Sequence, residues 1–141
     1  MNPSPPKRFS CEHRVIYSEC TVGDHIYYAR YLDILEEARG AFFRHMGVPF
    51  LQLQADDAIF PVIEVRVVYK SYARYDDVLS IELWPTAIQS VRLNFAYAVH
   101  NQSGALILQA ETKHVCTTVD GKPRKLPETL VEKLTPQLHP A

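Results

Sequence analysis

Side chains suited to acid–base chemistry lie immediately before the longest segment with helical periodicity. Glu19, Asp24 and His25 precede an amphipathic run that predicts a helix over residues 28–46. The first turn of a helix has unpaired backbone N–H groups and the positive end of the helix dipole, so it can hold a developing oxyanion. Asp24 could then act as a general base or nucleophile toward an acyl group, and His25 could orient a carbonyl or a water. Alternatively, Asp24 is only the N-cap of a core helix and His25 only caps and packs.

The elements that must position these residues are predicted from the periodicity of the apolar residues. In the helix, apolar residues recur every three or four positions, and Gly47 is suited to end it because glycine takes the left-handed conformation of a C-cap. Glu36, Glu37 and Arg39 lie on this helix. Because Glu36 and Glu37 are adjacent and point in different directions, one of them could face a cleft, although a solvated helix face is the simpler interpretation. β-Branched and aromatic residues with alternating polarity predict strands. The strands predicted in this way are residues 13–18, 60–73, 78–84, 90–100 and 105–119, of which the last is the longest.

The order of the elements predicts an α+β fold. Consecutive strands joined by tight turns favour an antiparallel sheet, and the single long helix offers an apolar stripe to cover one face. The expected picture is a curved antiparallel sheet wrapped around a central helix. Short helical turns are expected within residues 49–58 and 127–134. We expect one domain over residues 11–135, with a flexible N-terminal tail at residues 1–10 and a C-terminal tail at residues 136–141.

Composition excludes several classes of protein. The chain has 141 residues, 47% of them hydrophobic, and a formal net charge of −1, which fits one globular domain without general attraction to nucleic acid. No apolar run is long enough for a membrane span, and the proline-rich start lacks the apolar core of a secretion signal. The three cysteines have no metal-ligand spacing, so we expect reduced thiols in a cytoplasmic protein.

Common catalytic and cofactor motifs are missing from the sequence. It contains no phosphate-binding or dinucleotide-binding glycine motif, no GxSxG elbow and no HExxH pair, so we expect neither a metal nor a cofactor. The turn that contains Lys122, Arg124 and Lys125 could hold the phosphates of a ligand. Alternatively, it is an ordinary polar turn.

Five segments of the chain carry a family resemblance. They are ECTVGDHIYYARYLDILEEAR, YARYDDVLSIE, FAYAV, AETKHVCTTVDGK and KLPETL. On these segments, residues 14–134 resemble hotdog-fold acyl-CoA thioesterases of the 4-hydroxybenzoyl-CoA thioesterase type. The resemblance implies a hotdog fold and hydrolysis of an aromatic or fatty acyl thioester to the free acid and CoA, with CoA as part of the substrate and no further cofactor. It also implies a homodimer or homotetramer whose active sites lie at the interface between subunits.

The resemblance also implies roles for individual residues. In this family an acid, any residue and a catalytic acid precede the helix, and a backbone N–H at the helix start stabilises the oxyanion; here that N–H belongs to Tyr28 or to a residue just before it. Glu19 occupies the first acid position, but Thr21 occupies the catalytic one. Asp24 replaces the usual glycine, while His25 is retained. We therefore expect Asp24 or Glu19 to supply the missing carboxylate and His25 to position water.

The phosphates of CoA, or of a carrier protein, are expected to bind Arg92, Arg124 and Lys125. Two other functions stay open. Because Thr21 cannot act as a strong base, the chain could bind acyl thioesters without cleaving them, or it could be a thioesterase whose substrate is attached to an acyl carrier protein. A dehydratase is disfavoured because the long helix lacks an acid–histidine signature, and nothing specific indicates a purely structural module. The sequence determines neither the acyl group nor the choice between dimer and tetramer.

Overall fold

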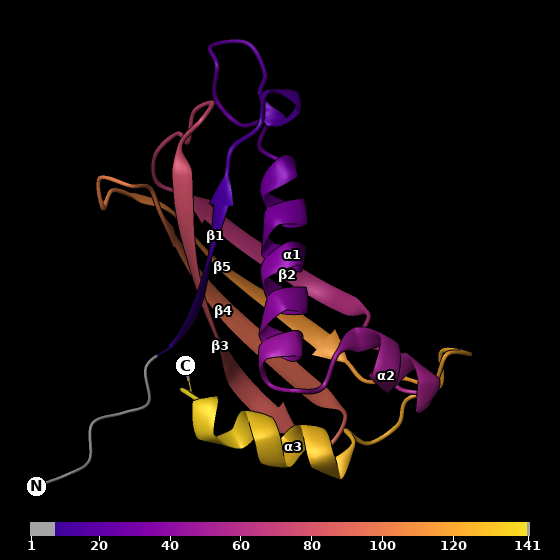
Figure 1. The fold of residues 1–141 in the computed structure, drawn as a ribbon. Coiled ribbons are helices and arrows are strands. Elements are labelled where there is room, and N and C mark those ends of the chain that lie inside the picture. The colour runs from indigo at the N-terminus through magenta and orange to yellow at the C-terminus, as the bar shows by residue number, and fades with distance from the viewer. Residues whose placement is uncertain (1–7, 141) are drawn as a thin grey trace, which may run out of the picture.

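The computed structural model describes residues 8–140, so most of the tail expected at residues 1–10 lies outside the described residues. The helices in this part of the chain are α1 (Arg30–His45), α2 (Phe50–Ala55) and α3 (Glu128–Leu134), with 3₁₀ turns at Tyr17–Glu19 and Thr135–Gln137. The strands are β1 (Phe9–Arg14), β2 (Val62–Tyr69), β3 (Val78–Gln89), β4 (Arg92–His100) and β5 (Leu106–Val115). Figure 1 shows α1 lying against one face of the sheet, with α3 below its lower end.

The described strands form one antiparallel sheet in the order β1-β3-β4-β5-β2, which leaves β1 and β2 at its edges. In β4, Leu93, Phe95, Tyr97 and Val99 are buried while the intervening residues are more exposed, which is the period of two expected for a sheet with one covered face. The cover is α1, whose buried residues recur at helical spacing. They are Tyr31, Ile34, Leu35, Ala38, Gly40, Phe42 and Phe43. The predicted α+β fold, a sheet wrapped around a central helix, is confirmed.

The long helix begins two residues later than predicted. Its N-cap position is Ala29, which has no side chain that could cap the first turn, and the Arg30 N–H donates to the Tyr27 carbonyl at 2.8 Å. At the other end Gly47 has a φ of 78°, and its N–H donates to the Arg44 carbonyl at 3.0 Å. The helix therefore ends as predicted, at a glycine in the left-handed conformation.

The first strand lies earlier in the chain than the sequence predicts. β1 ends at Arg14, and residues 17–19 form a 3₁₀ turn. The carboxylate of Glu19 accepts a hydrogen bond from the Ile16 N–H at 2.9 Å, and this local bond closes the turn in place of a strand ladder. The prediction of a strand over residues 13–18 was therefore wrong from residue 15 onward.

β3 is the longest strand, with 12 residues, whereas β5 has 10. The predicted strand of residues 78–84 stops before Pro85, whereas β3 continues through this proline, which cannot donate to a strand ladder. A bulge after Pro85 lets the pairing with β4 continue to Gln89. β5 ends early because Thr117 forms only isolated bridges with segments outside the named strands.

The two ends of the sheet carry different structures. At one end, which we call the turn end, the loop of residues 20–26 is tied to the segment after β2, where the Ile26 N–H donates to the Ala73 carbonyl at 2.9 Å. At the other, the α3 end, the Leu126 N–H donates to the Ser90 carbonyl at 2.9 Å and so ties the segment before α3 to the β3–β4 hairpin. α1 begins at the turn end, whereas β2 begins at the α3 end and finishes at the turn end (Figure 1).

Candidate active site

The loop of residues 20–26 is a tight hairpin in front of α1. The Asp24 N–H donates to the Thr21 carbonyl at 3.1 Å. Gly23 and Asp24 have φ values of 90° and 60°, a conformation that glycine takes freely and aspartate tolerates. Asp24 is therefore a turn residue, and the alternative that it caps the helix is wrong, since the N-cap position is Ala29.

A cavity of about 580 Å³ opens between this loop, the start of α1 and the end of β2, which is a typical size for a small-molecule site. We call it the turn-end cavity. Its lining residues are Thr21, His25, Ile26, Tyr27, Tyr28, Tyr31, Tyr69, Lys70, Ser71 and Tyr72. The wall is mostly aromatic, and none of these residues from the described chain is acidic. Of the predicted site residues, Thr21, His25 and Tyr28 are brought together here, whereas Glu19 and Asp24 are not in the lining.

The carboxylate of Glu19 is already engaged by its own neighbours. Besides the Ile16 N–H, it binds Nε2 of His13, with distances of 2.9 and 3.0 Å to its two oxygens, and its side chain is only 12% exposed. The other ring nitrogen of His13 lies 3.4 Å from the Glu37 carboxylate on α1. Glu19 thus ties β1, the turn and α1 together, and it does not point into the turn-end cavity.

His25 is held in one orientation by two contacts. Its ring stacks on that of Tyr72 with 4.2 Å between centroids, and its Nδ1 lies 3.2 Å from the Ile26 carbonyl oxygen. A carbonyl oxygen only accepts, so Nδ1 carries the proton of the neutral ring. The lone pair of neutral His25 is then on Nε2, where it can accept a proton from water.

The start of α1 offers a free backbone donor to the turn-end cavity. The Tyr27 N–H donates to the Glu19 carbonyl at 2.9 Å, and the Tyr28 carbonyl accepts the Tyr69 hydroxyl at 2.9 Å. Within residues 8–140 the Tyr28 N–H has no hydrogen-bond acceptor. It lies at the positive end of the helix dipole, where a donor of this kind stabilises an oxyanion.

Several wall residues were not among the predicted site residues. Tyr69, Lys70 and Tyr72 come from the end of β2 and the segment after it, and the sequence places them far from the turn. Alternation along β2 was the available signal, since it puts Tyr69 on the face toward α1. Tyr31 belongs to the apolar stripe of the predicted helix. Its hydroxyl accepts the Ala73 N–H at 3.3 Å, and burial raises its pKa, so it stays a neutral group in the wall.

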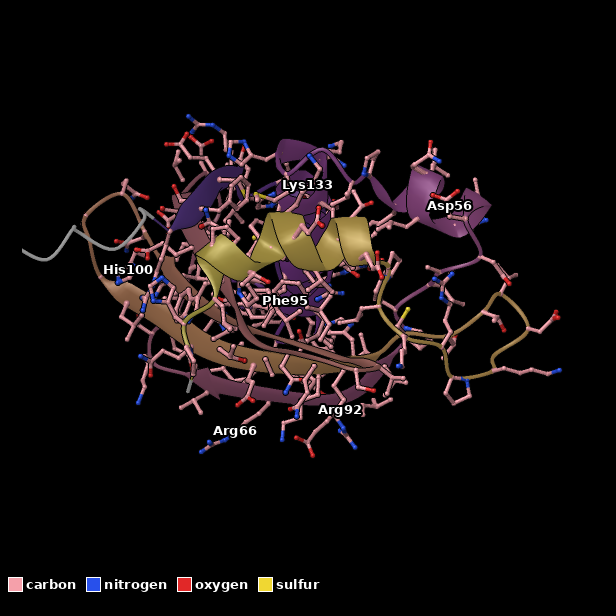
Figure 2. The ribbon with its side chains drawn as sticks, turned by 90° about the horizontal axis from the view of Figure 1, so that it is seen from below. Asp56, Arg66, Arg92, Phe95, His100 and Lys133 are labelled. Atoms are coloured by element: carbon pink, nitrogen blue, oxygen red, sulfur yellow. The ribbon has the colours of Figure 1, made fainter. Side chains whose placement is uncertain are left out.

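The cations predicted to bind phosphates lie at the α3 end and not beside the turn-end cavity of the same chain. The Arg124 guanidinium donates to the Asp56 carbonyl at 2.9 Å and, through Nε, to the Lys125 carbonyl at 3.1 Å, so it holds two loops together. Arg92 begins β4, and Figure 2 shows its side chain directed away from α3, on the same side of the sheet as Arg66.

Comparisons with known proteins agree with this architecture. Residues 8–134 match the family described as the thioesterase-like superfamily. The acyl-CoA thioester hydrolase YbgC of Escherichia coli is 33% identical over 119 residues, which cover 84% of this chain and 89% of that protein. The putative acyl-CoA thioesterase YneP of Bacillus subtilis is 24% identical over 105 residues, covering 74% and 76% of the two chains.

Solved structures agree as well. The crystal structure of a hypothetical protein from Aquifex aeolicus superimposes with a TM-score of 0.85 and 26% identity, covering 89% of this chain and 98% of that one. The match with the family extends over nearly the whole described chain, from β1 to the end of α3. The chain therefore belongs to the thioesterase-like superfamily.

Proposed function

We propose that the turn-end cavity is where this chain, an acyl-CoA thioester hydrolase, performs its reaction. The names of its relatives, among them YbgC of Escherichia coli, support the choice of an acyl-CoA substrate. The observation that carries the choice of site is the Tyr28 N–H, which has no acceptor within the described residues and lies at the start of α1 in the lining of a cavity that also contains His25.

We assign the role of base to His25, because no acidic side chain of the described residues lines the cavity. Nε2 of His25 takes a proton from a water, whose oxygen attacks the carbonyl carbon of the thioester. The carbonyl oxygen becomes an oxyanion, which the Tyr28 N–H binds. When the intermediate collapses, the C–S bond breaks and His25 returns the proton to the sulfur, so the products are the free acid and CoA thiol.

Two neighbours of His25 have supporting roles in this proposal. The Thr21 hydroxyl can donate to and accept from the attacking water, which would orient it without removing its proton. Asp24 is exposed and adjacent to His25 in the chain, so its carboxylate is the second candidate for the base. The reaction needs no group beyond the chain, a water and the CoA ester.

The substrate's phosphates are proposed to bind where two copies of the chain meet. β2 is an edge strand with exposed apolar residues, including Ile63 at 53% and Val65 at 43%, and an exposed apolar edge of this kind favours pairing with a second chain. Antiparallel β2–β2 pairing would place the turn end of one copy beside the α3 end of the other. Arg92 and Lys125 of one copy would then reach the CoA bound by its neighbour, in a homodimer or a homotetramer.

The cysteines bear on the compartment in which we propose that the enzyme works. Cys11, Cys20 and Cys116 are all free. Free thiols persist in a reducing compartment, which supports the cytoplasm as the place where the enzyme works.

The test is thiol release from a panel of aromatic and aliphatic acyl-CoA esters, followed with a thiol-trapping dye. We expect saturable release that falls about 10²- to 10⁴-fold in His25→Asn and stays near the wild-type rate in the control His45→Asn, which changes a histidine at the α3 end of α1. The same loss in Asp24→Asn, with His25→Asn active, would move the role of base to Asp24. Tight binding of acyl-CoA without any release would instead identify a non-catalytic binding protein.

A further inference from the structure

A second cavity, of about 320 Å³, lies between α1, α2 and the segment that leads into β2. Its size is at the lower end of the range for ligand sites. Its walls include Glu36, Arg39 and Phe43 of α1, Phe50 and Gln54 of α2, and His114 of β5. We call it the Arg39 cavity. Its walls combine large apolar surfaces with a few charged and polar groups, which is the composition of a site that recognises one end of a ligand.

The charge of Arg39 is not neutralised within the described chain. Its Nη1 donates to the Tyr97 hydroxyl at 3.1 Å. No carboxylate of residues 8–140 lies within 4.0 Å of the guanidinium, although Glu36 lines the same cavity. Arginine stays protonated and has five N–H donors. A half-buried cation with one neutral partner is incompletely compensated, so an anion that enters the cavity would gain a charged hydrogen bond.

A buried chain of hydrogen bonds holds Arg39 in place and supplies no negative charge. His114 Nδ1 donates to the Phe60 carbonyl at 3.0 Å, so its Nε2 accepts from the Thr112 hydroxyl at 2.8 Å. Thr112 in turn accepts from the Tyr97 hydroxyl at 2.6 Å, and Tyr97 accepts from Arg39. Burial lowers the pKa of His114 to about 4, so the ring is neutral near pH 7. In each of these hydrogen bonds the donor is the group nearer to Arg39 along the chain of bonds. The chain therefore fixes the guanidinium and leaves its charge available to a ligand.

The position of the Arg39 cavity relates it to the proposed reaction. Tyr31 lines the turn-end cavity and Arg39 lines the second one, and a separation of eight positions spans about 12 Å along a helix. Both cavities also adjoin β2, one at each end of the strand. An acyl group whose thioester lies at Tyr28 could therefore extend along α1 toward Arg39.

We infer that the Arg39 cavity binds the far end of the acyl group and selects acyl groups that end in a carboxylate. This inference rests on the proposed function, because it names the acyl class for the same reaction. Phe43 and Phe50 would pack against the methylene or aryl part of the acyl group, and the Arg39 guanidinium would bind the terminal carboxylate through two parallel N–H bonds. Glu36, on the same wall, opposes an anionic ligand and so limits its affinity.

The kinetic test compares two acyl-CoA esters of equal length, hexanedioyl-CoA with a terminal carboxylate and hexanoyl-CoA without one. We expect kcat/KM to be about 10- to 100-fold higher for hexanedioyl-CoA, the range for a hydrogen bond to a charged group. Arg39→Met should abolish this preference by lowering kcat/KM for hexanedioyl-CoA to the value for hexanoyl-CoA. The matched control is Arg44→Met, which removes the same charge from α1 outside the cavity and should keep the preference. Equal kcat/KM for the two esters in the wild type would overturn the inference.

A binding test separates this inference from the proposed reaction. Calorimetric titration with hexanedioate and with hexane-1,6-diol needs no turnover, so it measures binding to the Arg39 cavity even if no thioester is cleaved. If the diacid binds but no thioester is cleaved, only the proposed function fails. We expect hexanedioate to bind more tightly than the diol, to weaken about 10- to 100-fold in Arg39→Met, and to bind more tightly in Glu36→Gln. Glu36→Gln breaks no bond of the buried chain, so it guards against a folding defect in Arg39→Met. Equal binding of the diacid and the diol, or no change in either variant, would refute the inference.

Discussion

The two cavities along α1 are built in different ways. The proposed catalytic groups of the turn-end cavity, Thr21, His25 and the Tyr28 N–H, are close in the chain, although part of the wall comes from the end of β2. His25 is fixed by stacking on Tyr72 and by a bond to Ile26. The Arg39 cavity joins α1, α2 and β5, and the buried hydrogen-bond chain crosses the sheet. The proposed chemistry therefore depends mainly on local backbone geometry, whereas the proposed selectivity depends on tertiary packing and charge.

The largest expected effect tests whether the chemistry resides in the backbone at Tyr28. Tyr28→Pro removes the N–H that we assign to the oxyanion, and we expect kcat for acyl-CoA to fall about 10²- to 10³-fold. Tyr28→Ala is the matched control, because it removes the side chain and keeps the N–H. If both variants lose the same activity, the aromatic ring and not the N–H is responsible, and the assignment of the oxyanion site is wrong.

The second effect concerns the stability of the Arg39 cavity as the pH falls. The pKa of His114 is about 4 in the folded protein because of burial and about 6.5 when the ring is exposed on unfolding. Between these values the unfolded state binds more protons, so the contribution of His114 to stability is complete above pH 6.5 and is lost as the pH falls toward 4. We expect the free energy of unfolding from urea titrations to decrease by about 3 kcal/mol across this window, relative to His114→Gln. If the free energies of unfolding of the two proteins change with pH in parallel, His114 is not held neutral in the folded state.

A third prediction tests whether the two cavities can be uncoupled. Thr112→Val keeps the shape of the side chain but leaves the Tyr97 hydroxyl and His114 Nε2 without their shared partner. We expect a loss of about 2 kcal/mol in the free energy of unfolding, with hydrolysis of hexanoyl-CoA retained and the preference for hexanedioyl-CoA reduced. Thr117→Val is the control, because its hydroxyl binds only the adjacent Thr118 carbonyl. An equal loss of activity toward both esters would mean that the cavities act as one unit.

The same contrast explains which parts of the site could be predicted from the sequence. Thr21, His25 and Tyr28 are close in the chain, so the spacing of a turn followed by a helix was enough to group them. The fold class followed from periodicity, because one long helix and several alternating strands allow few arrangements. The alternative that Asp24 caps the helix was wrong because the hairpin gives Asp24 a left-handed backbone, and spacing alone does not reveal that.

The Arg39 cavity could not be predicted in the same way. Arg39 lies on the predicted helix beside two acids for which a solvated face was the simpler interpretation. Alternation places Thr112 and His114 on the same strand face as Ala110, but polar side chains at these positions do not show which partners they meet. They are buried, at 2% exposure each, because the sheet curves over α1 and their hydroxyl and ring satisfy each other. Such a network depends on residues far apart in the chain, and one sequence does not record which of them meet.

The smallest expected effect concerns Glu19, and it decides whether this acid at the turn end has a structural or a catalytic role. Glu19 binds His13 and the Ile16 N–H and lies outside the cavity lining. We therefore expect Glu19→Gln to lower the free energy of unfolding by about 1 kcal/mol, through a weakened charged hydrogen bond, while kcat stays near the wild-type value. Glu37→Gln, which alters the exposed partner of the same histidine, should change stability by less than about 0.5 kcal/mol. If Glu19→Gln instead folds with full stability and loses about 10²-fold in kcat, then Glu19 supplies a catalytic carboxylate, and His25 is not the sole base at the turn end.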